Sequence, residues 1–431
     1  MSIKVGTYNV LKTNKERYLL LALLFFTVVI NYMDRINISV AASAVRGDLG
    51  LSKEAMGLIF SAWAWTYTAF QIPGGLVADR FHARILYPII LVGWSIATVV
   101  QGLINSLGAL IGCRIFVGAF EAPSYPINNK VVTEWFPPEQ RASAISVYVS
   151  GQYVGLAFLA PILTILLVEI GWRNFMIATG VLGVVWAAIW YLSYPKGEGS
   201  EKNKTENGDM NPVGSPEADK TQSKPDFGLA LGHTKLWGVY IGQFAIGSVF
   251  IFFLTWFPTY LTEYRGIEIV KSGFMAAVPY LGAFCGVLLA GFSSDWMTRK
   301  GISAEISRKA PVMIGLLFST AIVGANYTND NNIAIAFLTV SFFGVGLASI
   351  TWVFVSLIAP DDQVGLVGGF FNFFGGSSAI VTPLLIGMLI SDDNFAPAFI
   401  YIGAVAIMGF LSYLFLVGKV EKIENKSCLD N

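Results

Sequence analysis

The chain has 431 residues, of which 55% are hydrophobic and only 13% are charged. Soluble proteins carry about 25% charged residues, and the mean hydropathy of this chain is high at +0.62. Lysine and arginine together number 28, and so do aspartate and glutamate, so the formal net charge is zero. These values exclude an ordinary soluble enzyme, a disordered chain and a nucleic-acid-binding protein that needs a basic face.

Apolar runs of about 20 residues, the length that crosses the hydrocarbon core of a bilayer, recur along the chain. Glycine and proline interrupt many of these runs, which a packed membrane bundle tolerates. We therefore predict an all-α membrane protein with twelve transmembrane helices, at residues 18–43, 55–78, 85–106, 109–132, 143–168, 173–194, 235–262, 272–293, 310–328, 331–357, 364–390 and 396–418.

A polar segment divides these spans six and six. Residues 196–226 are charged and rich in Gly, Pro and Ser, which indicates a flexible linker. The predicted organisation is an N-terminal tail, an N-terminal six-helix bundle (the N-half), a linker, a C-terminal six-helix bundle (the C-half) and a C-terminal tail, at residues 1–17, 18–195, 196–234, 235–418 and 419–431.

The distribution of basic residues predicts the orientation. With both termini and the linker in the cytoplasm, 21 of the 28 Lys and Arg lie on the cytoplasmic side. Loops on that side of a membrane carry the basic excess, so this orientation is favoured. Five basic residues lie on the opposite side and two lie within spans, namely Arg46, Lys53, Arg173, Arg265 and Lys271 outside, and Arg35 and Arg114 in the membrane.

The two halves show a weak internal repeat. Gly75-Leu-Val-Ala-Asp79 ends the second span and Gly291-Phe-Ser-Ser-Asp295 ends the eighth, 216 residues later. Gly57 and Gly273, near the starts of the same two spans, are also 216 residues apart. Parallel six-helix repeats around a linker are typical of transporters that work by alternating access around a site at the membrane midplane.

These motifs resemble a known family. Gly75-x-x-x-Asp79-Arg80-x-x-x-Arg84 is similar to the loop signature of the major facilitator superfamily, although His82 stands where the family usually has Gly. Residues 31–41, 60–75, 114–126, 150–158, 252–261, 348–352 and 368–376 resemble the anion:cation symporters of that superfamily.

The resemblance implies two pseudo-symmetric six-helix bundles in a bacterial inner membrane. It also implies a monomer that imports a sugar acid such as D-galactonate together with protons. The expected partners are the sugar-acid anion, protons and membrane lipid, with no nucleic acid and no cofactor. Hexuronates, glucarate, other organic anions and a sodium-coupled version stay open as alternatives. The C-half spans have no Lys or Arg in mid-helix, which favours one carboxylate per substrate.

Charged residues within the spans are the first candidates for function, because each costs about 2.5–3.5 kcal/mol to insert. They are Asp34, Arg35, Arg114 and Glu121. Arg114 and Glu121 are seven residues apart and share a helix face, whereas Asp34 and Arg35 point about 100° apart. We expect Arg35 to face the central cavity and bind the substrate carboxylate. Alternatively, Arg35 only neutralises Asp34 or Glu121.

Proton coupling needs a titratable group, and no histidine lies in a span. The carboxylates Asp34 and Glu121 are therefore the candidate proton carriers, and the resemblance implies that role for both. We expect Asp34 to point toward the fourth span, where Arg114 completes a charge network. The alternative is a static cluster of ion pairs that holds the first and fourth spans together.

Neutral polar and aromatic side chains complete a possible sugar-acid site, because hydroxyl groups need neutral donors and acceptors and an aromatic face can cover the carbon chain. The candidates are Tyr32, Tyr67 and Gln152 in the N-half, and Gln243, Thr255, Trp256, Ser349, Thr351, Trp352 and Asn372 in the C-half. The resemblance implies substrate contact for Tyr32, Tyr67, Gln152, Ser349, Thr351 and Asn372. Hydrogen bonding between helices or plain packing is the alternative for each.

Charges at the cytoplasmic ends of the second and eighth spans predict a gate. An acid at a helix end beside basic loop residues can hold the two halves together in one state. The predicted gate residues are Asp79, Arg80 and Arg84, with Asp295 and Arg299 in the second copy. Alternatively, the Arg residues only determine the orientation of the chain in the membrane. Three cysteines and two distant histidines predict neither disulfides nor a metal site, and no nucleophile–base pair suggests an enzyme.

Overall fold

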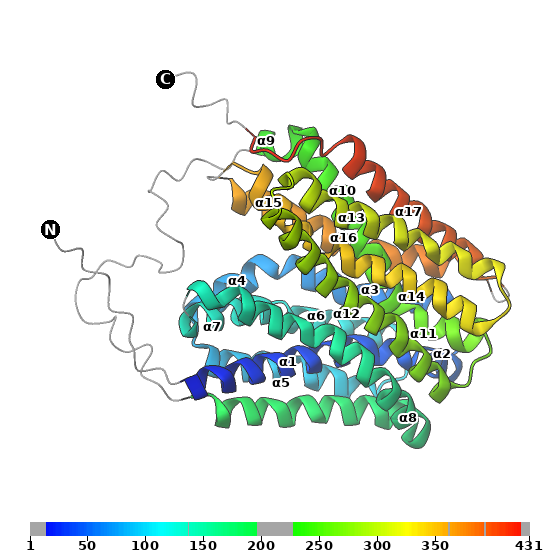
Figure 1. Cartoon of the computed structure of the whole chain (residues 1–431). Helices are drawn as coiled ribbons and strands as arrows, with labels where there is room; N and C mark the ends of the chain where they lie inside the picture. The colour runs from blue at the N-terminus through cyan, green and yellow to red at the C-terminus, as the bar shows by residue number, and fades with distance from the viewer. Residues whose placement is uncertain (1–13, 137, 196–226, 361–362, 392–393, 424–431) are drawn as a thin grey trace.

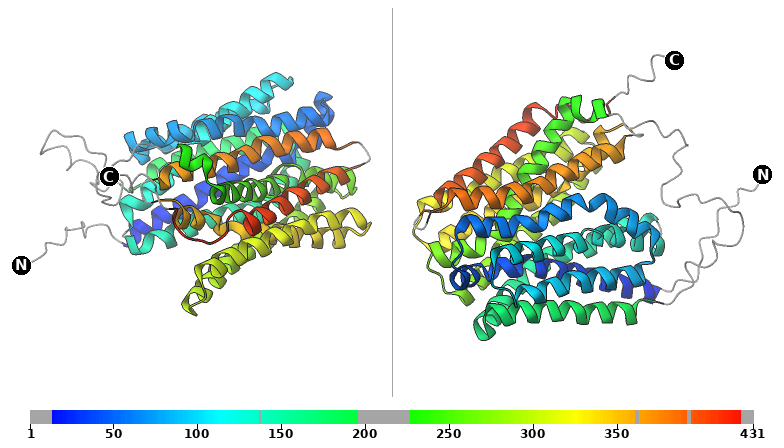
Figure 2. Two further views of the ribbon diagram at one scale, coloured as in Figure 1. Left: turned by 90° about the horizontal axis from the view of Figure 1, so that it is seen from above. Right: turned by 180° about the vertical axis from the view of Figure 1, so that it is seen from behind.

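The computed structural model describes residues 14–136, 138–195, 227–360, 363–391 and 394–423. Within those residues every regular element is a helix, as Figures 1 and 2 show. The predicted tails at 1–13 and 424–431 and the linker at 196–226 lie outside the described residues.

The N-half elements begin before the predicted first span. The first helix starts four residues earlier than predicted, at Asn14, and a short helix follows it where the sequence predicted only a loop. The elements are α1 (Asn14–Val40), α2 (Ala42–Leu49), α3 (Lys53–Ala69), α4 (Gln71–Arg80), α5 (Ala83–Gln101), α6 (Leu107–Glu121), α7 (Ser124–Trp135) and α8 (Pro138–Ser193).

The C-half elements include several short non-α turns. A short helix, α9, falls within the range predicted as linker. The elements are α9 (Phe227–Gly232), α10 (Thr234–Thr255), α11 (Phe257–Thr259), the π-helical η1 (Tyr260–Tyr264), α12 (Ile269–Arg299), α13 (Ala304–Ser319), the 3₁₀ turn η2 (Thr320–Tyr327), α14 (Asn331–Leu347), the 3₁₀ turn η3 (Ala348–Thr351), α15 (Trp352–Ile358), α16 (Val364–Leu389) and α17 (Ala396–Phe415).

Ten helical stretches of the described chain are long and apolar enough to cross a membrane. The predicted second span is split at Phe70 into α3 and α4, so neither piece reaches that length. The predicted fifth and sixth spans run together as α8, where Gly171 leaves helical geometry with φ 73°. Both differences have a local cause, so the structure is consistent with twelve spans, and the count of twelve stays a prediction.

The helices fall into two groups that follow the chain order (Figure 1). Those up to residue 195 gather on one side, and those from 227 onward gather on the other. We call the end of the molecule where α1 begins and α17 ends the termini end, and the opposite end, where α1 ends, the far end. At the far end the two groups pack through α3 against α16 and α8 against α12.

Glycines make this far-end packing close. A Cβ added at Gly57 of α3 would lie 2.7 Å from the carbonyl oxygen of Pro383 in α16. A Cβ at Gly273 of α12 would lie 2.8 Å from the carbonyl oxygen of Ala160 in α8. Toward the termini end the two groups diverge (Figure 2). A Cβ at Gly75, near that end of α4, would meet nothing within 4 Å.

Candidate functional site

An ion pair between Arg35 and Glu121 lies in the core of the N-half. The Nε of Arg35 donates to Oε2 of Glu121 at 3.1 Å, and the indole Nε1 of Trp63 donates to the same oxygen at 2.8 Å. Arg35 is 7% exposed and Glu121 is fully buried. Helices α1, α3 and α6 therefore each supply one member of this cluster. The sequence predicted the two charged residues, but it did not predict Trp63.

Aromatic rings surround the guanidinium of Arg35. Its central carbon lies 4.4 Å from the centroid of the Trp63 ring and 4.8 Å from the centroids of Tyr32 and Tyr67. The rings of Trp63 and Tyr67 stack at 4.5 Å. A desolvated cation–π contact is worth about 2 kcal/mol. These rings hold the guanidinium in place and leave its Nη2, which has no hydrogen-bond partner among the described residues, as a buried donor.

Asp34 points away from Arg35, as their adjacency requires, but its partner differs from the expected one. Its Oδ2 accepts a 2.9 Å hydrogen bond from the indole Nε1 of Trp94 in α5, and its side chain is 1% exposed. The part of the chain that the structure describes holds no ion pair between Asp34 and Arg114.

Arg114 is buried near both carboxylates, and the described residues show no direct ion pair between it and either of them. It is 3% exposed and interacts electrostatically with both Asp34 and Glu121. Its Nε and Nη1 find no hydrogen-bond partner among the described residues. Asp34, Arg35, Arg114 and Glu121 are thus a cluster of four buried ionisable groups, in which Arg35 and Glu121 form a direct ion pair. The role of Arg114 in a charge network stays a prediction.

The C-half contributes neutral polar groups. The hydroxyl of Thr351 in η3 donates to Oε1 of Gln243 in α10 at 3.0 Å. That bond turns the amide nitrogen of Gln243 toward Gly375, whose added Cβ would lie 3.1 Å from it. Both Gln243 and Ser349 are partly exposed, and Asn372 of α16 is exposed. On the N-half side, Gln152 of α8 is partly exposed as well.

Three other predicted contact residues serve packing in this conformation. Thr255 is buried and its hydroxyl donates to the carbonyl of Ile251, one turn back in α10. Trp256 is 1% exposed, and its Nε1 donates to the carbonyl of Pro383 at 3.1 Å. Trp352 is half-exposed and its ring lies 4.9 Å from that of Phe371. Whether these three contact substrate stays a prediction.

The predicted gate residues lie at the termini end. Asp79 and Arg80 are exposed at the end of α4, and the guanidinium of Arg84 lies over the ring of Tyr191 at 5.0 Å. Arg299 is exposed in the last turn of α12, and the side chain of Asp295 lies outside what the structure describes. The two helix groups diverge at this end (Figure 2), and the gate role of these residues stays a prediction.

Contacts between the halves occur at the far end, and the sequence did not predict them. Arg46 forms a 2.9 Å ion pair with Glu263 of η1. The Nζ of Lys53, in the first turn of α3, donates to the hydroxyl of Tyr264 and to the carbonyl oxygen of Ser391 at 2.7 Å. Burial raises the pKa of Tyr264, and the ammonium of Lys53 partly opposes that shift. These bonds close the far end.

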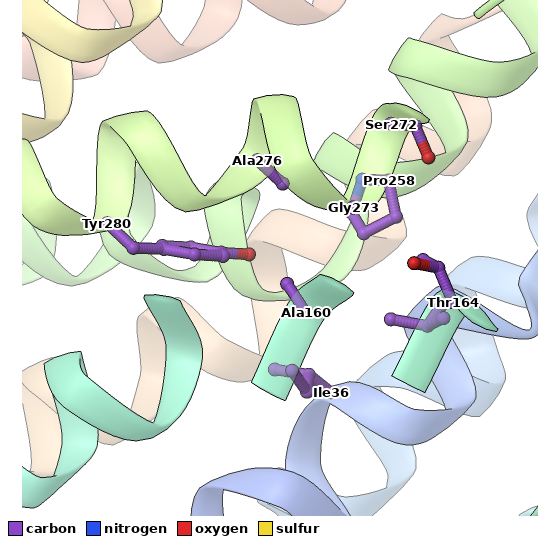
Figure 3. Close-up of a pocket in the computed structure, with 9 residues that line it drawn as sticks. Ile36, Ala160, Thr164, Pro258, Ser272, Gly273, Ala276 and Tyr280 are labelled. Atoms are coloured by element: carbon purple, nitrogen blue, oxygen red, sulfur yellow. The ribbon is translucent and has the colours of Figure 1, made fainter. Parts of the chain in front are cut away.

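A small crevice also lies at the far-end seam (Figure 3). It is lined by Ile36, Val40, Ala160, Thr164, Pro258, Ser272, Gly273, Ala276 and Tyr280. The close-up shows side chains from α1, α8 and α12 converging there. Its lining holds no charged residue, so it does not suit a carboxylate, and the described residues form no cluster of three metal-binding side chains anywhere.

Comparison with known proteins places these features in a family. A sequence profile described as the Major Facilitator Superfamily matches residues 24–378. The chain belongs to the major facilitator superfamily. The protein is therefore a membrane transporter and not an enzyme, as predicted.

Curated relatives cover nearly the whole transporter. It is 47% identical to the D-galactonate transporter of Escherichia coli O6:H1 (strain CFT073), over 96% of this chain and 99% of that protein. It is 37% identical to the probable galactarate/D-glucarate transporter GudP of Escherichia coli (strain K12), over 99% and 98% of the two chains. It is 31% identical to the hexuronate transporter of Bacillus subtilis (strain 168), over 93% and 94%.

Solved structures agree on the fold. The bacterial homologue of the human lysosomal transporter Spinster, in its inward-facing and unoccupied conformation, matches with a TM-score of 0.70 at 20% identity, over 94% and 95% of the two chains. The nucleoside transporter NupG matches with a TM-score of 0.69 at 12% identity, over 93% of this chain and 99% of its own. At these identities the likeness shows the all-helical fold of the superfamily.

Proposed function

We propose that the transporter is a proton-coupled symporter that imports a sugar acid, D-galactonate, by alternating access between two six-helix halves. The observation that carries this proposal is the buried guanidinium of Arg35 within its aromatic box. Its Nε is paired with Glu121, and its Nη2 has no hydrogen-bond partner in the part of the chain that the structure describes. The 47% identity to a D-galactonate transporter supports the choice of substrate.

Arg35 suits a carboxylate because a guanidinium is permanently charged and can donate two parallel hydrogen bonds. The rings of Tyr32 and Tyr67 flank it and supply hydroxyl groups for the substrate. Polar groups of the C-half, including the oriented amide of Gln243 and the hydroxyl of Ser349, would bind the sugar hydroxyls. One cation on the N-half side and neutral groups opposite favour a substrate with one carboxylate.

Glu121 gives a physical basis for proton coupling. Its carboxylate and the substrate carboxylate compete for the same cation, because Glu121 Oε2 accepts from Nε of Arg35. Protonation of Glu121 would weaken that ion pair and release Arg35 for substrate. Two ligands that each favour one state of a site are linked reciprocally, so bound substrate would in turn favour the proton. Asp34, held by Trp94, would be the second protonation site.

The conformation of the described residues corresponds to one stage of the proposed transport cycle. The far end is closed by Arg46–Glu263 and the bonds of Lys53, whereas the halves diverge at the termini end. With both termini in the cytoplasm of a bacterial inner membrane, this is the inward-facing state. Import would begin outward-facing, where Asp34 and Glu121 take up protons and the substrate binds Arg35. The halves would then rock, and Asp79, Arg80 and Arg84 would close the cytoplasmic side.

Other substrates of the same chemistry are the alternatives. The galactarate/D-glucarate and hexuronate transporters among the relatives make a hexuronate, glucarate or another organic anion the first competitors. A dicarboxylate should require a second cationic group in the cavity. Sodium in place of protons is the other alternative.

Ligand binding to the purified transporter tests the substrate. A bound ligand stabilises the folded state by mass action, so the melting temperature should rise with D-galactonate and less with glucuronate or galactarate. Arg35→Ala should lose the D-galactonate response. Because it leaves the buried Glu121 without its partner, the melting temperature of the ligand-free variant should also fall, so the response is measured as the shift that D-galactonate causes in the variant itself. A larger response to galactarate would overturn the monocarboxylate assignment, and a wild-type response in Arg35→Ala would overturn the role of Arg35.

A further inference from the structure

The N-half contains a column of buried polar side chains that extends from Asp34 and Trp94 toward the far end. On α5, Trp94, Thr98 and Gln101 follow at spacings of four and three residues, so they share one face of the helix. On α1, Asn37 lies one turn beyond Asp34 toward the far end. Each of these five side chains is 1% exposed or less. The amide nitrogen of Asn37 donates to the hydroxyl of Thr179 in α8 at 3.3 Å. Helix α8 packs against both α1 and α5.

Several atoms of this column have no hydrogen-bond partner among the described residues. They are both polar atoms of the Gln101 amide, Oδ1 of Asn37, Oδ1 of Asp34, and Nε and Nη1 of Arg114. An unsatisfied buried polar atom costs about 1–3 kcal/mol. Buried waters satisfy such groups in proteins and make about three hydrogen bonds each. Bound waters would satisfy these four atoms of the column and the two atoms of the neighbouring Arg114 on α6.

The column joins two defined points. At one end the indole of Trp94 bonds Asp34, and Arg114 interacts electrostatically with the same carboxylate. At the other end Gln101 is the last residue of α5, directly before the far-end loop 102–106. Arg173 fastens that loop by donating to the carbonyl oxygen of Ile104 at 3.0 Å, and it pairs with Asp48 at the exposed surface.

We propose that a file of buried waters runs through the N-half from Gln101 at the far-end loop to Asp34, and that Asp34 exchanges protons with the far side along it. The file itself rests on the geometry of the column, and its use for protons rests on the proposed function. It is separate from the substrate cavity, because it begins at the face of α1 that carries Asp34 and bonds Trp94 of α5, about 100° around the helix from the face on which Arg35 bonds Glu121.

Arg114 ends the file. It lies on α6 between the far end and Glu121, and its fixed positive charge opposes the onward passage of a proton toward the central cavity. The file thus delivers protons to Asp34 without opening a continuous leak through the membrane. It also explains why the N-half core holds this polar column although its helices cross an apolar membrane.

Hydroxyl-radical footprinting tests the file directly, because radicals formed from bound water oxidise the side chains beside it. Trp94 and Trp256 are matched reporters: they are 0% and 1% exposed, and each indole nitrogen donates a hydrogen bond. Trp94 should be oxidised several-fold faster than Trp256. Equal, slow oxidation of both residues would overturn the file.

Substitutions then test its use. Gln101→Leu, which keeps the volume and removes the polar atoms, should slow both Trp94 oxidation and proton-driven accumulation several-fold. Substrate affinity and substrate exchange should stay at wild-type values, and Gln101→Asn should restore accumulation.

Thr98→Val is the second variant if Gln101→Leu does not fold, with Thr382→Val, buried in the C-half, as its control. Normal proton-driven accumulation in the two file variants would overturn the proton role. The two claims can fail separately. If the wild type accumulates substrate without a proton gradient, proton coupling is wrong, whereas fast oxidation of Trp94 still supports the file of waters.

Discussion

Alanine at Gly57 or Gly273 should open the far end. A Cβ at Gly57 would lie 2.7 Å from the carbonyl oxygen of Pro383, and at Gly273 it would lie 2.8 Å from that of Ala160. Both of these contacts are to backbone atoms, which cannot turn aside as a side chain can. At Gly273 the hydroxyl of Thr164 is closer still, but that side chain can rotate. Because each contact crosses from one half to the other, a methyl group there pushes the halves apart at the far end only.

The structure sets the size of the effect. Overpacking of this kind costs about 1–3 kcal/mol in the state that is crowded. If the outward-facing state relieves the contact, each substitution should shift the ratio of the two states by about 5- to 150-fold toward far-end opening. The two glycines lie in different pairs of helices, α3–α16 and α8–α12, so their effects should add.

Electron–electron double resonance can measure this shift. Spin labels at Gly47 and Lys271, which are exposed at the far end in opposite halves, would report the separation in a background without the three cysteines. Gly112→Ala is the matched control, since a Cβ there meets nothing within 4 Å. Gly273→Ala should populate a longer distance that Gly112→Ala lacks. Identical distance distributions in the two variants would refute the argument that these glycines permit closure.

Three further predictions follow from the charged residues. Arg35→Lys keeps the positive charge but loses the planar guanidinium, which can bind Glu121 and the substrate carboxylate at the same time. D-galactonate should therefore bind about 10- to 100-fold more weakly in a calorimetric titration. Unchanged affinity would contradict direct contact between Arg35 and the substrate. Glu121→Gln should abolish uphill accumulation in vesicles yet retain substrate exchange, and surviving accumulation would make Glu121 structural. Arg46→Glu should favour the far-end-open state by up to about 1 kcal/mol plus the added repulsion, because the pair is partly exposed. The double variant with Glu263→Arg should restore the balance between the two states that the same spin labels report. Failure to restore it would show that this ion pair does not hold the far end closed.

Much of the fold follows from apolar run length, and the exceptions have physical causes. The predicted span 364–390 corresponds to α16 (Val364–Leu389), because its ends are marked by polar residues. Run length cannot show that a helix breaks at Phe70, nor that α8 continues around Gly171, since both depend on local backbone geometry. The helix α2 escaped prediction because its eight residues carry no apolar run.

The sequence was enough to identify the buried charged residues of the candidate site, but it was not enough to identify their hydrogen-bond partners. The cost of burying charge in a membrane identified Arg35 and Glu121, and the structure joins them directly. Helical geometry gave the direction of Asp34 relative to Arg35, but it gave no reason to choose between two neighbouring helices, and Trp94 of α5 is the partner instead of Arg114. Trp63 was missed because an indole donor in an aromatic-rich helix leaves no distinctive sequence signal.

The far-end contacts needed the structure entirely. Lys53 was assigned only to the outer side by its position, whereas it is 7% exposed and bonds residues of the opposite half. Its partner Ser391 is 338 residues away in the chain. No periodicity or spacing in the sequence connects positions that lie so far apart. The sequence also does not show which end of the molecule is closed in this conformation.

Uptake of D-galactonate into proteoliposomes tests the central claim of proton-coupled transport most directly. With an inward proton gradient and no sodium, the account predicts accumulation above the outside concentration, its collapse by a protonophore, and inward movement of positive charge if two protons accompany one anion. Uptake that only equilibrates, or accumulation that requires a sodium gradient, would contradict it.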